Sequence, residues 1–241
     1  MSNPARNTIE FRLWGRHALF TDPITKIGGE KCSYHLPTYE ALKGVAKSIY
    51  WKPTLIWVID EVRVMKRIQT QTKGLKPLDM GGGNTLAIYT FLSEVEYQVR
   101  AHFEWNTHRP ELVADRIEGK HFAIAQRMLE RGGRQDIFLG TRDCQAYVEP
   151  VVYGQGVGHY DSDGELAYGL MFHGFDYPDE TGSANLEARF WRPVMQGGVI
   201  RFVAPNNCPV RRTVRPMGVK RFGLDGNVAS VEDTHLSWGG V

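Results

Sequence analysis

Lys120 and His121 are adjacent in the segment "EGKHFAIAQRMLERGGR", where a glycine directly precedes an amphipathic pattern. A histidine exchanges a proton near neutral pH, and the lysine places a full positive charge beside it. A helix N-terminus adds unpaired N–H groups and the positive end of a dipole, which together form a weak phosphate site. The pair therefore suits a phosphodiester, although two such residues at a helix entrance are more often simply solvated.

Hydrophobic periodicity predicts the elements that position this pair. Alternating or β-branched residues predict strands over 8–20, 54–66, 95–105 and 145–153. Apolar residues at helical spacing predict helices within 37–53 and 116–134, the first ended by Pro53 and the second by Gly132 and Gly133. Segments 21–37 and 73–87, rich in glycine and proline, are expected to be loops.

The order strand, helix, strand, strand, helix, strand is that of the split βαβ arrangement. We therefore expect an α+β chain with a ferredoxin-like (RRM-like, βαββαβ) domain over residues 1–154. Residues 155–241 are expected to form a small β-rich domain with a weakly structured tail, because glycine-rich turns separate short strand-like pieces such as "LEARFW" and "GVIRFV".

In a ferredoxin-like domain the two helices pack side by side in opposite directions. The end of the first helix, "SIYWKP", should then lie near the start of the second, so that Tyr50 approaches Lys120 and His121. RNA carries its own nucleophile, the 2′-hydroxyl, and its cleavage to a 2′,3′-cyclic phosphate needs a base, an acid and a charge clamp. The residues alone do not decide which of Tyr50 and His121 is the acid, and a tyrosine at a helix end is more often a packing residue.

Composition restricts the class of protein. The net charge of +2 over 241 residues means that any nucleic-acid surface must be local. No apolar run reaches the roughly 18 residues of a membrane span, and the N-terminus lacks the apolar core of a signal peptide. Cys32, Cys144 and Cys208 are odd in number and far apart, so a reduced cytoplasmic protein without a metal site is expected.

The other polar residues give weaker indications of function. The remaining histidines show no metal-ligand spacing, and the adjacent Asp60 and Glu61 should point to opposite faces of their strand, which argues against a metal-dependent nuclease. The basic run Arg211, Arg212, Arg215, Lys220 and Arg221 is expected to be a solvated face.

Long stretches of the sequence resemble a known family. They include "ALFTDPITKIGGEKCSYHLPTYEALKGVAKSIYWKP", "VIDEVRVMK", "GGGNTLA", "EGKHFAIAQRMLERGGRQDIFLGTRDCQAYV" and "HGFDYPDETG". In this order, from about residue 7 to about residue 210, the chain closely resembles the type I-C CRISPR-associated Cas-five proteins, the subtype given the suffix d. The last 30 residues match only loosely.

The resemblance implies a function. Members of this subtype cut precursor CRISPR RNA at the base of the repeat hairpin without a metal or other cofactor, and stay on the 5′ handle of the mature guide RNA. Their catalytic tyrosine lies in "IYWKP", which is Tyr50 here, and their lysine and histidine lie in "EGKH", which are Lys120 and His121. The implied partners are the backbone (filament) subunit and the large subunit of the Cascade surveillance complex, with target DNA reached only through the complex.

Five further residues are weaker candidates for holding RNA. The polar loops are expected to contribute Lys26, Lys31 and Asn84, and the residues flanking the second helix are Arg109 and Arg134. The rival interpretation is a non-catalytic subunit that caps the 5′ handle while another protein processes the RNA.

Overall fold

The computed structural model describes residues 7–219 except 28, 79–80 and 118, and the expected weakly structured tail lies outside this range. The fold is mixed α/β and mostly antiparallel, with few helices. The elements that position the candidate site are β1 (Thr8–Ala18), α2 (Tyr39–Ile49), β3 (Leu55–Val64), β5 (Ala87–Trp105), η1 (Pro110–Asp115), α3 (Lys120–Glu130) and β7 (Gln145–Pro150).

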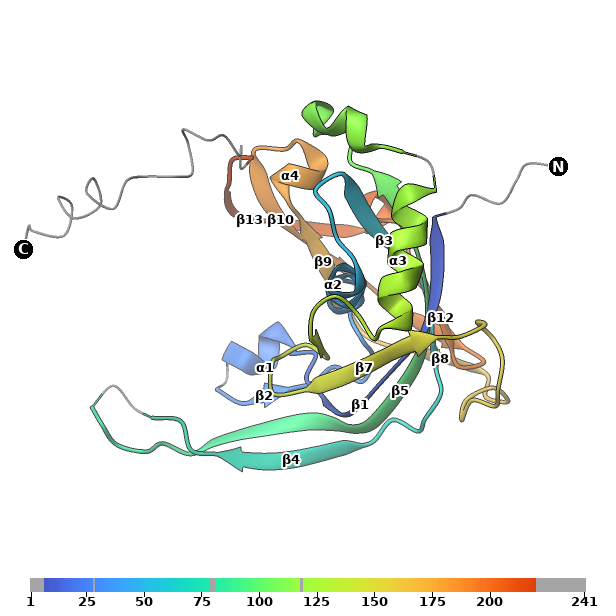
Figure 1. Ribbon diagram of the computed structural model, residues 1–241. Coiled ribbons are helices and arrows are strands. Elements are labelled where there is room, and N and C mark those ends of the chain that lie inside the picture. The colour runs from blue at the N-terminus through green and yellow to red at the C-terminus, as the bar shows by residue number, and fades with distance from the viewer. Residues whose placement is uncertain (1–6, 28, 79–80, 118, 220–241) are drawn as a thin grey trace, which may run out of the picture.

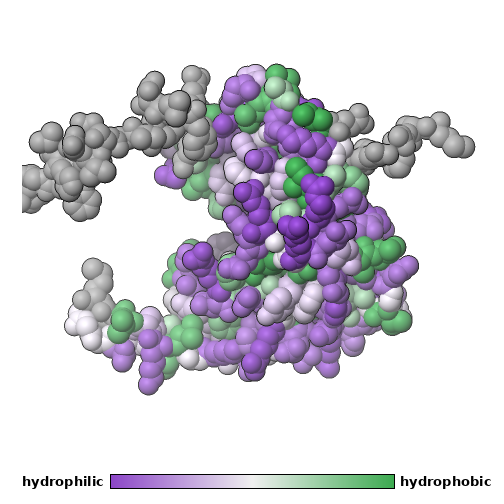
Figure 2. All heavy atoms as spheres, in the orientation of Figure 1, coloured by the Kyte–Doolittle hydropathy of each residue, from purple (hydrophilic) through white to green (hydrophobic). Residues whose placement is uncertain are grey.

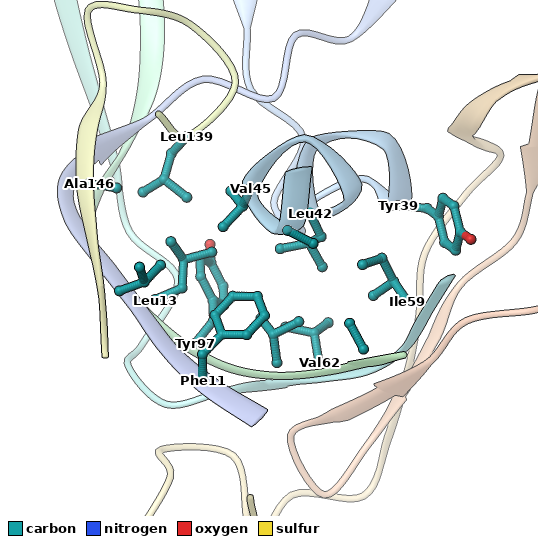
Figure 3. Packing of buried hydrophobic residues seen from close by; sticks show 14 of the residues in the cluster. Phe11, Leu13, Tyr39, Leu42, Val45, Ile59, Val62, Tyr97, Leu139 and Ala146 are labelled. Atoms are coloured by element: carbon teal, nitrogen blue, oxygen red, sulfur yellow. The ribbon is translucent and has the colours of Figure 1, made fainter. Parts of the chain in front are cut away.

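The central strands of the main sheet lie in the order β7-β1-β5-β3, each antiparallel to its neighbour. Helices α2 and α3 cover one face of these strands (Figure 1). Between α2 and the sheet, Leu42 and Val45 of the helix meet Phe11, Val62 and Tyr97 of the strands (Figure 3). The predicted elements of this region are thus present, although β5 begins at Ala87 and not at residue 95 as predicted.

Local sequence fixes the ends of both helices. The side chain of Thr38 accepts a hydrogen bond from the Ala41 amide (3.1 Å) and caps α2. Helix α3 ends where Gly132 and Gly133, both at positive φ, turn their amides back to carbonyls of its last turn. The buried face of α3 carries His121 as well as Ala125 and Leu129, so the histidine belongs to the core face.

The prediction of a loop over 73–87 was wrong in part. Strand β4 (Thr70–Leu75) pairs with the first part of β5 in a long hairpin that projects from the body (Figure 1). Most side chains of β4 are exposed, so no alternation marked the strand. The expected loop over 21–37 likewise contains α1 (Pro23–Ile27) and β2 (Lys31–Cys32), the latter parallel to β5.

The prediction that Asp60 and Glu61 point to opposite faces of their strand was also wrong. A register shift between Ile59 and Glu61 inserts one extra residue into β3. Both carboxylates consequently meet side chains of β5 that lie on one face: Asp60 contacts His102 and Glu61 contacts Arg100. Each acid is therefore paired with a basic side chain of β5.

Segments after residue 155 contribute to two sheets. Strands β8 (Glu165–Ala167), β11 (Val194–Gln196) and β12 (Val199–Arg201) extend the main sheet beyond β3, and β6 (Ile137–Phe138) extends it beyond β7. A separate sheet has the order β13-β10-β9. Its strands are β9 (Met171–Asp176), β10 (Asn185–Trp191) and β13 (Val210–Pro216), accompanied by α4 (Pro178–Thr181) and η2 (Pro205–Asn207).

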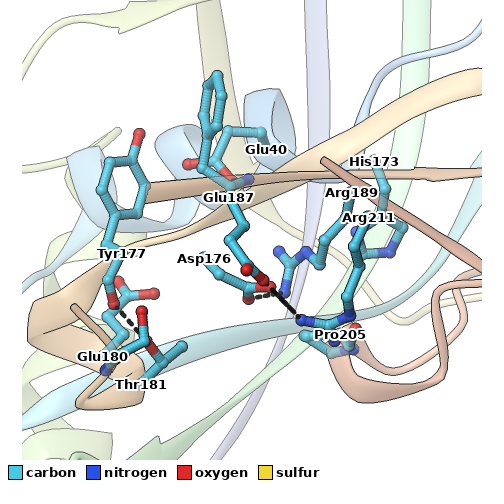
Figure 4. A network of polar contacts seen from close by, with 12 residues as sticks. Glu40, His173, Asp176, Tyr177, Glu180, Thr181, Glu187, Arg189, Pro205 and Arg211 are labelled. Carbon is cyan, nitrogen blue, oxygen red and sulfur yellow. Dashed lines mark hydrogen bonds and ion pairs between the residues drawn. The ribbon is translucent and has the colours of Figure 1, made fainter. Parts of the chain in front are cut away.

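Ion pairs hold the small sheet together and against α2. Asp176 binds both Arg189 and Arg211 (Figure 4). Glu180 binds Lys43 and Lys47 of α2. Arg211 is therefore paired, contrary to the expected solvated face; Lys220 and Arg221 lie outside the described residues. Because α2 ends at the candidate site, these contacts also fix the position of that site.

Candidate active site

The residue that follows α2 and the first residues of α3 meet as predicted. Tyr50 follows Ile49 directly, and its hydroxyl lies 2.8 Å from Nδ1 of His121. Tyr50 is 2% exposed and His121 is fully buried. The histidine of the Lys-His dipeptide is therefore not a solvated surface residue. The carbonyl of Tyr50 accepts a hydrogen bond from the indole of Trp57 (2.7 Å), which fixes the chain where it leaves the helix.

The surroundings of His121 determine which ring nitrogen can exchange a proton. Its Nε2 lies 2.7 Å from the backbone carbonyl oxygen of Asp115. A carbonyl only accepts hydrogen bonds, so Nε2 carries a proton in both the neutral and the charged ring. The exchangeable proton is therefore the one on Nδ1, which faces the hydroxyl of Tyr50. The rings of Phe103 and Trp105 enclose the imidazole edge-on.

Asp115 is a component of the site that the sequence did not reveal. Its carboxylate lies 2.5 Å from Nζ of Lys120, 2.7 Å from the hydroxyl of Thr54 and 3.4 Å from Nε2 of His121. The hydrogen bonds from Lys120 and Thr54 lower the pKa of Asp115. The residue precedes Lys120 by five positions at the end of η1, where no periodic pattern indicates a contact.

The residues of the candidate site differ in pKa and in exposure. Burial raises the pKa of Tyr50, and the negative charge of Asp115 adds to this, while the positive charge of Arg134 opposes it. The Lys120 side chain remains 40% exposed despite its ion pair. The site thus combines a neutral phenol, an imidazole with one exchangeable proton and an accessible cation, which is a set suited to moving protons beside a phosphate.

The structure separates the five weaker candidates. Lys26 in α1 is exposed, Lys31 lies over the ring of Tyr89, and Asn84 is exposed in the β4–β5 hairpin. Arg109 is buried and forms an ion pair with Glu111 (2.6 Å).

Arg134 lies close to the end of α2, and its charge acts on Tyr50. Its amide donates to the carbonyls of Ser48 and Ile49, directly before Tyr50.

Within the described residues, no group of three or more His, Cys, Asp or Glu side chains has the arrangement of a metal site. No helix in the same part of the chain is both long enough and apolar enough to cross a membrane.

Comparison with known proteins supplies the family. The family model for CRISPR-associated Cas5d proteins matches residues 8–203, which is most of the chain. The chain belongs to the Cas5d family. A crystal structure of a CRISPR-associated protein has a TM-score of 0.73 and 35% identity, covering 86% of this chain and 96% of that one. The crystal structure of a functionally uncharacterized protein from Streptococcus mutans has a TM-score of 0.72 and 38% identity. The match covers 86% of this chain and 97% of that one.

Two curated Cas5d proteins are also similar, and both are named CRISPR pre-crRNA endoribonucleases. The one from Mannheimia succiniciproducens is 39% identical over 66 residues, covering 27% of this chain and 28% of its own length. The one from Thermus thermophilus is 26% identical over 152 residues, covering 59% of this chain and 63% of its own length. The matches thus span less than two thirds of either relative.

Proposed function

We propose that this Cas5d-family chain is an endoribonuclease that cleaves precursor CRISPR RNA without a metal and then stays on the 5′ handle. The observation that carries the proposal is the hydrogen bond between Tyr50 and His121 beside Lys120. The names of the two curated relatives support the same activity.

In the proposed reaction the 2′-oxygen of the RNA forms a bond to phosphorus while the bond to the 5′-oxygen breaks. The 2′-hydroxyl loses its proton to a base, and the leaving 5′-oxygen gains one from an acid. His121 exchanges the proton on Nδ1 through the hydroxyl of Tyr50, because the ring has no exposed surface of its own. Lys120 stabilises the negative charge that develops on the phosphate oxygens.

Asp115 has a defined part in this mechanism. Its carboxylate forms an ion pair with the ammonium group of Lys120 in the free protein. An RNA phosphate brings the same charge to the same cation, so substrate binding competes with this ion pair. The Asp115 carbonyl keeps its bond to Nε2 and holds the imidazole in one orientation.

The fold assignment and the partners belong to the same proposal. The order β7-β1-β5-β3 with α2 and α3 on one face supports a ferredoxin-like domain over 1–154, and the separate three-stranded sheet supports a β-rich domain after 155. We assign the repeat hairpin and 5′ handle as ligands, the backbone and large Cascade subunits as neighbours, target DNA as an indirect contact, and the cytoplasm as the location.

A single substitution in the substrate tests the proposed chemistry. A repeat RNA with one 2′-deoxynucleotide on the 5′ side of the cut lacks the nucleophile and should bind but stay intact. The unmodified RNA should yield a 2′,3′-cyclic phosphate and a 5′-hydroxyl. Cleavage of the deoxy-substituted RNA would overturn the mechanism. Binding of both RNAs with cleavage of neither would support the non-catalytic cap instead.

A further inference from the structure

A cavity beside the candidate active site has no part in the mechanism above. Its volume is about 820 Å³, and its walls come from the end of α2, the loop after α3, and the edge strands β6 and β7. Figure 1 shows the loop after α3 passing over the end of α2. On this side of the molecule, Figure 2 shows hydrophilic side chains gathered over the middle.

Three arginines converge on this cavity: Arg131, Arg134 and Arg142. All three are exposed, and none forms a hydrogen bond or ion pair through its guanidinium within the described part of the chain. The guanidinium of Arg142 lies over the ring of Phe138, 5.9 Å from its centroid. This contrasts with Arg12 and Arg100, each of which binds two carboxylates. Asp136 is the one acidic residue of the lining, so the cavity keeps an excess of positive charge that would stabilise a bound anion.

Aromatic and amide side chains complete the walls. Tyr147 is 54% exposed at the cavity, and its ring lies 5.8 Å from that of Trp14. Phe138 also lines the cavity, together with the amides of Gln135 and Gln145. Exposed aromatic faces stack nucleobases, and amides hydrogen-bond to base edges. Arginines for phosphates and aromatic rings for bases are the combination that single-stranded RNA requires.

The cavity is connected to the catalytic residues through the backbone. Ser48 lines it, and the Arg134 amide donates to the carbonyls of Ser48 (3.0 Å) and Ile49 (3.2 Å). Tyr50 lies two residues after Ser48, so at most about 7 Å of backbone separates the cavity wall from the tyrosine. The charge of Arg134 also acts on Tyr50 and lowers its pKa against the effect of burial.

We propose that this cavity binds the single-stranded ribonucleotides next to the scissile phosphate, with Arg131, Arg134 and Arg142 on their phosphates and Tyr147 stacked on a base. The inference rests on the proposed function and adds a substrate site to it. It explains why a chain with a net charge of only +2 leaves three guanidiniums unpaired at one place.

The test measures binding of the deoxy-substituted repeat RNA, which cannot be consumed, by fluorescence anisotropy. The variants are the double substitution Arg131→Ala and Arg142→Ala, and the single substitution Tyr147→Ala. Arg127→Ala is the matched control, because this exposed arginine lies on α3 and does not line the cavity. All are surface changes, and thermal melts verify that each variant folds.

We expect Tyr147→Ala to weaken binding about 5- to 150-fold, the effect of losing one stacked base. The double arginine variant should also reduce the slope of log K against log salt by about 1.4, which is two phosphate contacts of about 0.7 each. Arg127→Ala should leave the affinity within about twofold and the salt slope unchanged. If the cavity variants bind like the control, the cavity proposal is overturned.

Cleavage of unmodified RNA separates this proposal from the proposed function. If the wild type cuts and the cavity variants bind and cut equally well, the endonuclease stands and the cavity proposal falls. If the wild type binds without cutting and the cavity variants lose binding, the cavity proposal stands and the catalytic function falls. Absence of any RNA binding by the wild type overturns both.

Discussion

His173 makes the packing of the small sheet on α2 sensitive to acid. The ring is fully buried on β9, stacks on Tyr39 of α2 with 4.2 Å between ring centroids, and donates from Nε2 to the carbonyl of Val203. Burial, with the nearby charge of Arg189, lowers the pKa of His173 to about 3. The folded protein therefore keeps this ring neutral at pH values where an unfolded chain protonates it.

The size of the effect follows from proton linkage. Between the folded pKa of about 3 and the unfolded pKa of about 6.5, the unfolded state binds one more proton, so stability rises with pH. The contribution is complete above about pH 6.5 and is lost as the pH falls towards 3. At about pH 4.5, two units below 6.5, the loss is about 3 kcal/mol, since each unit is worth about 1.4 kcal/mol.

Urea unfolding followed by tryptophan fluorescence measures this loss. The wild type and His173→Phe are compared at about pH 7.5 and about pH 4.5, with phenylalanine retaining the stack on Tyr39. Other titrating groups are common to both proteins and cancel in the difference. The variant should lose about 3 kcal/mol less than the wild type on acidification. Equal losses in the two proteins would refute the assignment of a neutral, desolvated ring.

Three further predictions concern the site and its support. Tyr50→Phe should slow RNA cleavage about 10²- to 10⁴-fold in single-turnover assays with unchanged RNA affinity, and an unchanged rate would exclude the tyrosine from proton transfer. Glu180→Ala leaves the buried ammonium of Lys43 without its closest carboxylate and should cost about 3–5 kcal/mol in urea unfolding; a cost below about 1 kcal/mol would contradict this ion pair. At Gly140 a Cβ would lie 2.0 Å from a backbone carbonyl oxygen, whereas at Gly154, also at positive φ, it would meet nothing within 4 Å. Gly140→Ala should therefore cost about 1–3 kcal/mol more than Gly154→Ala in thermal melts, and equal costs would contradict the packing.

The contact between Tyr50 and His121 could be predicted because it depends on element order alone. Two helices that cross in opposite directions on one sheet bring the end of one to the start of the other, whatever the details of packing. Periodicity supplied those elements, since α2 and β1 each bury one regular set of side chains.

Features without a periodic signal could not be predicted. Strand β4 is exposed on most of its length, and the three-residue strands β8, β11 and β12 are too short to alternate. The bulge at Asp60 moves one carboxylate to the other face, a shift that depends on pairing with β5. Asp115 reaches Lys120 through the geometry of η1, and the three unpaired arginines meet only once the loop after α3 has folded.

Metal-free RNA cleavage that requires His121 is the step on which the proposed function depends most directly. A repeat RNA is incubated in excess EDTA with the wild type and with His121→Ala, and both binding and cleavage are followed. The wild type should cut once, leaving a 2′,3′-cyclic phosphate and a 5′-hydroxyl, while the variant binds equally well and cuts at least about 10²-fold more slowly. Cleavage by the wild type only after metal is added, or equal cleavage by both proteins, would contradict the account.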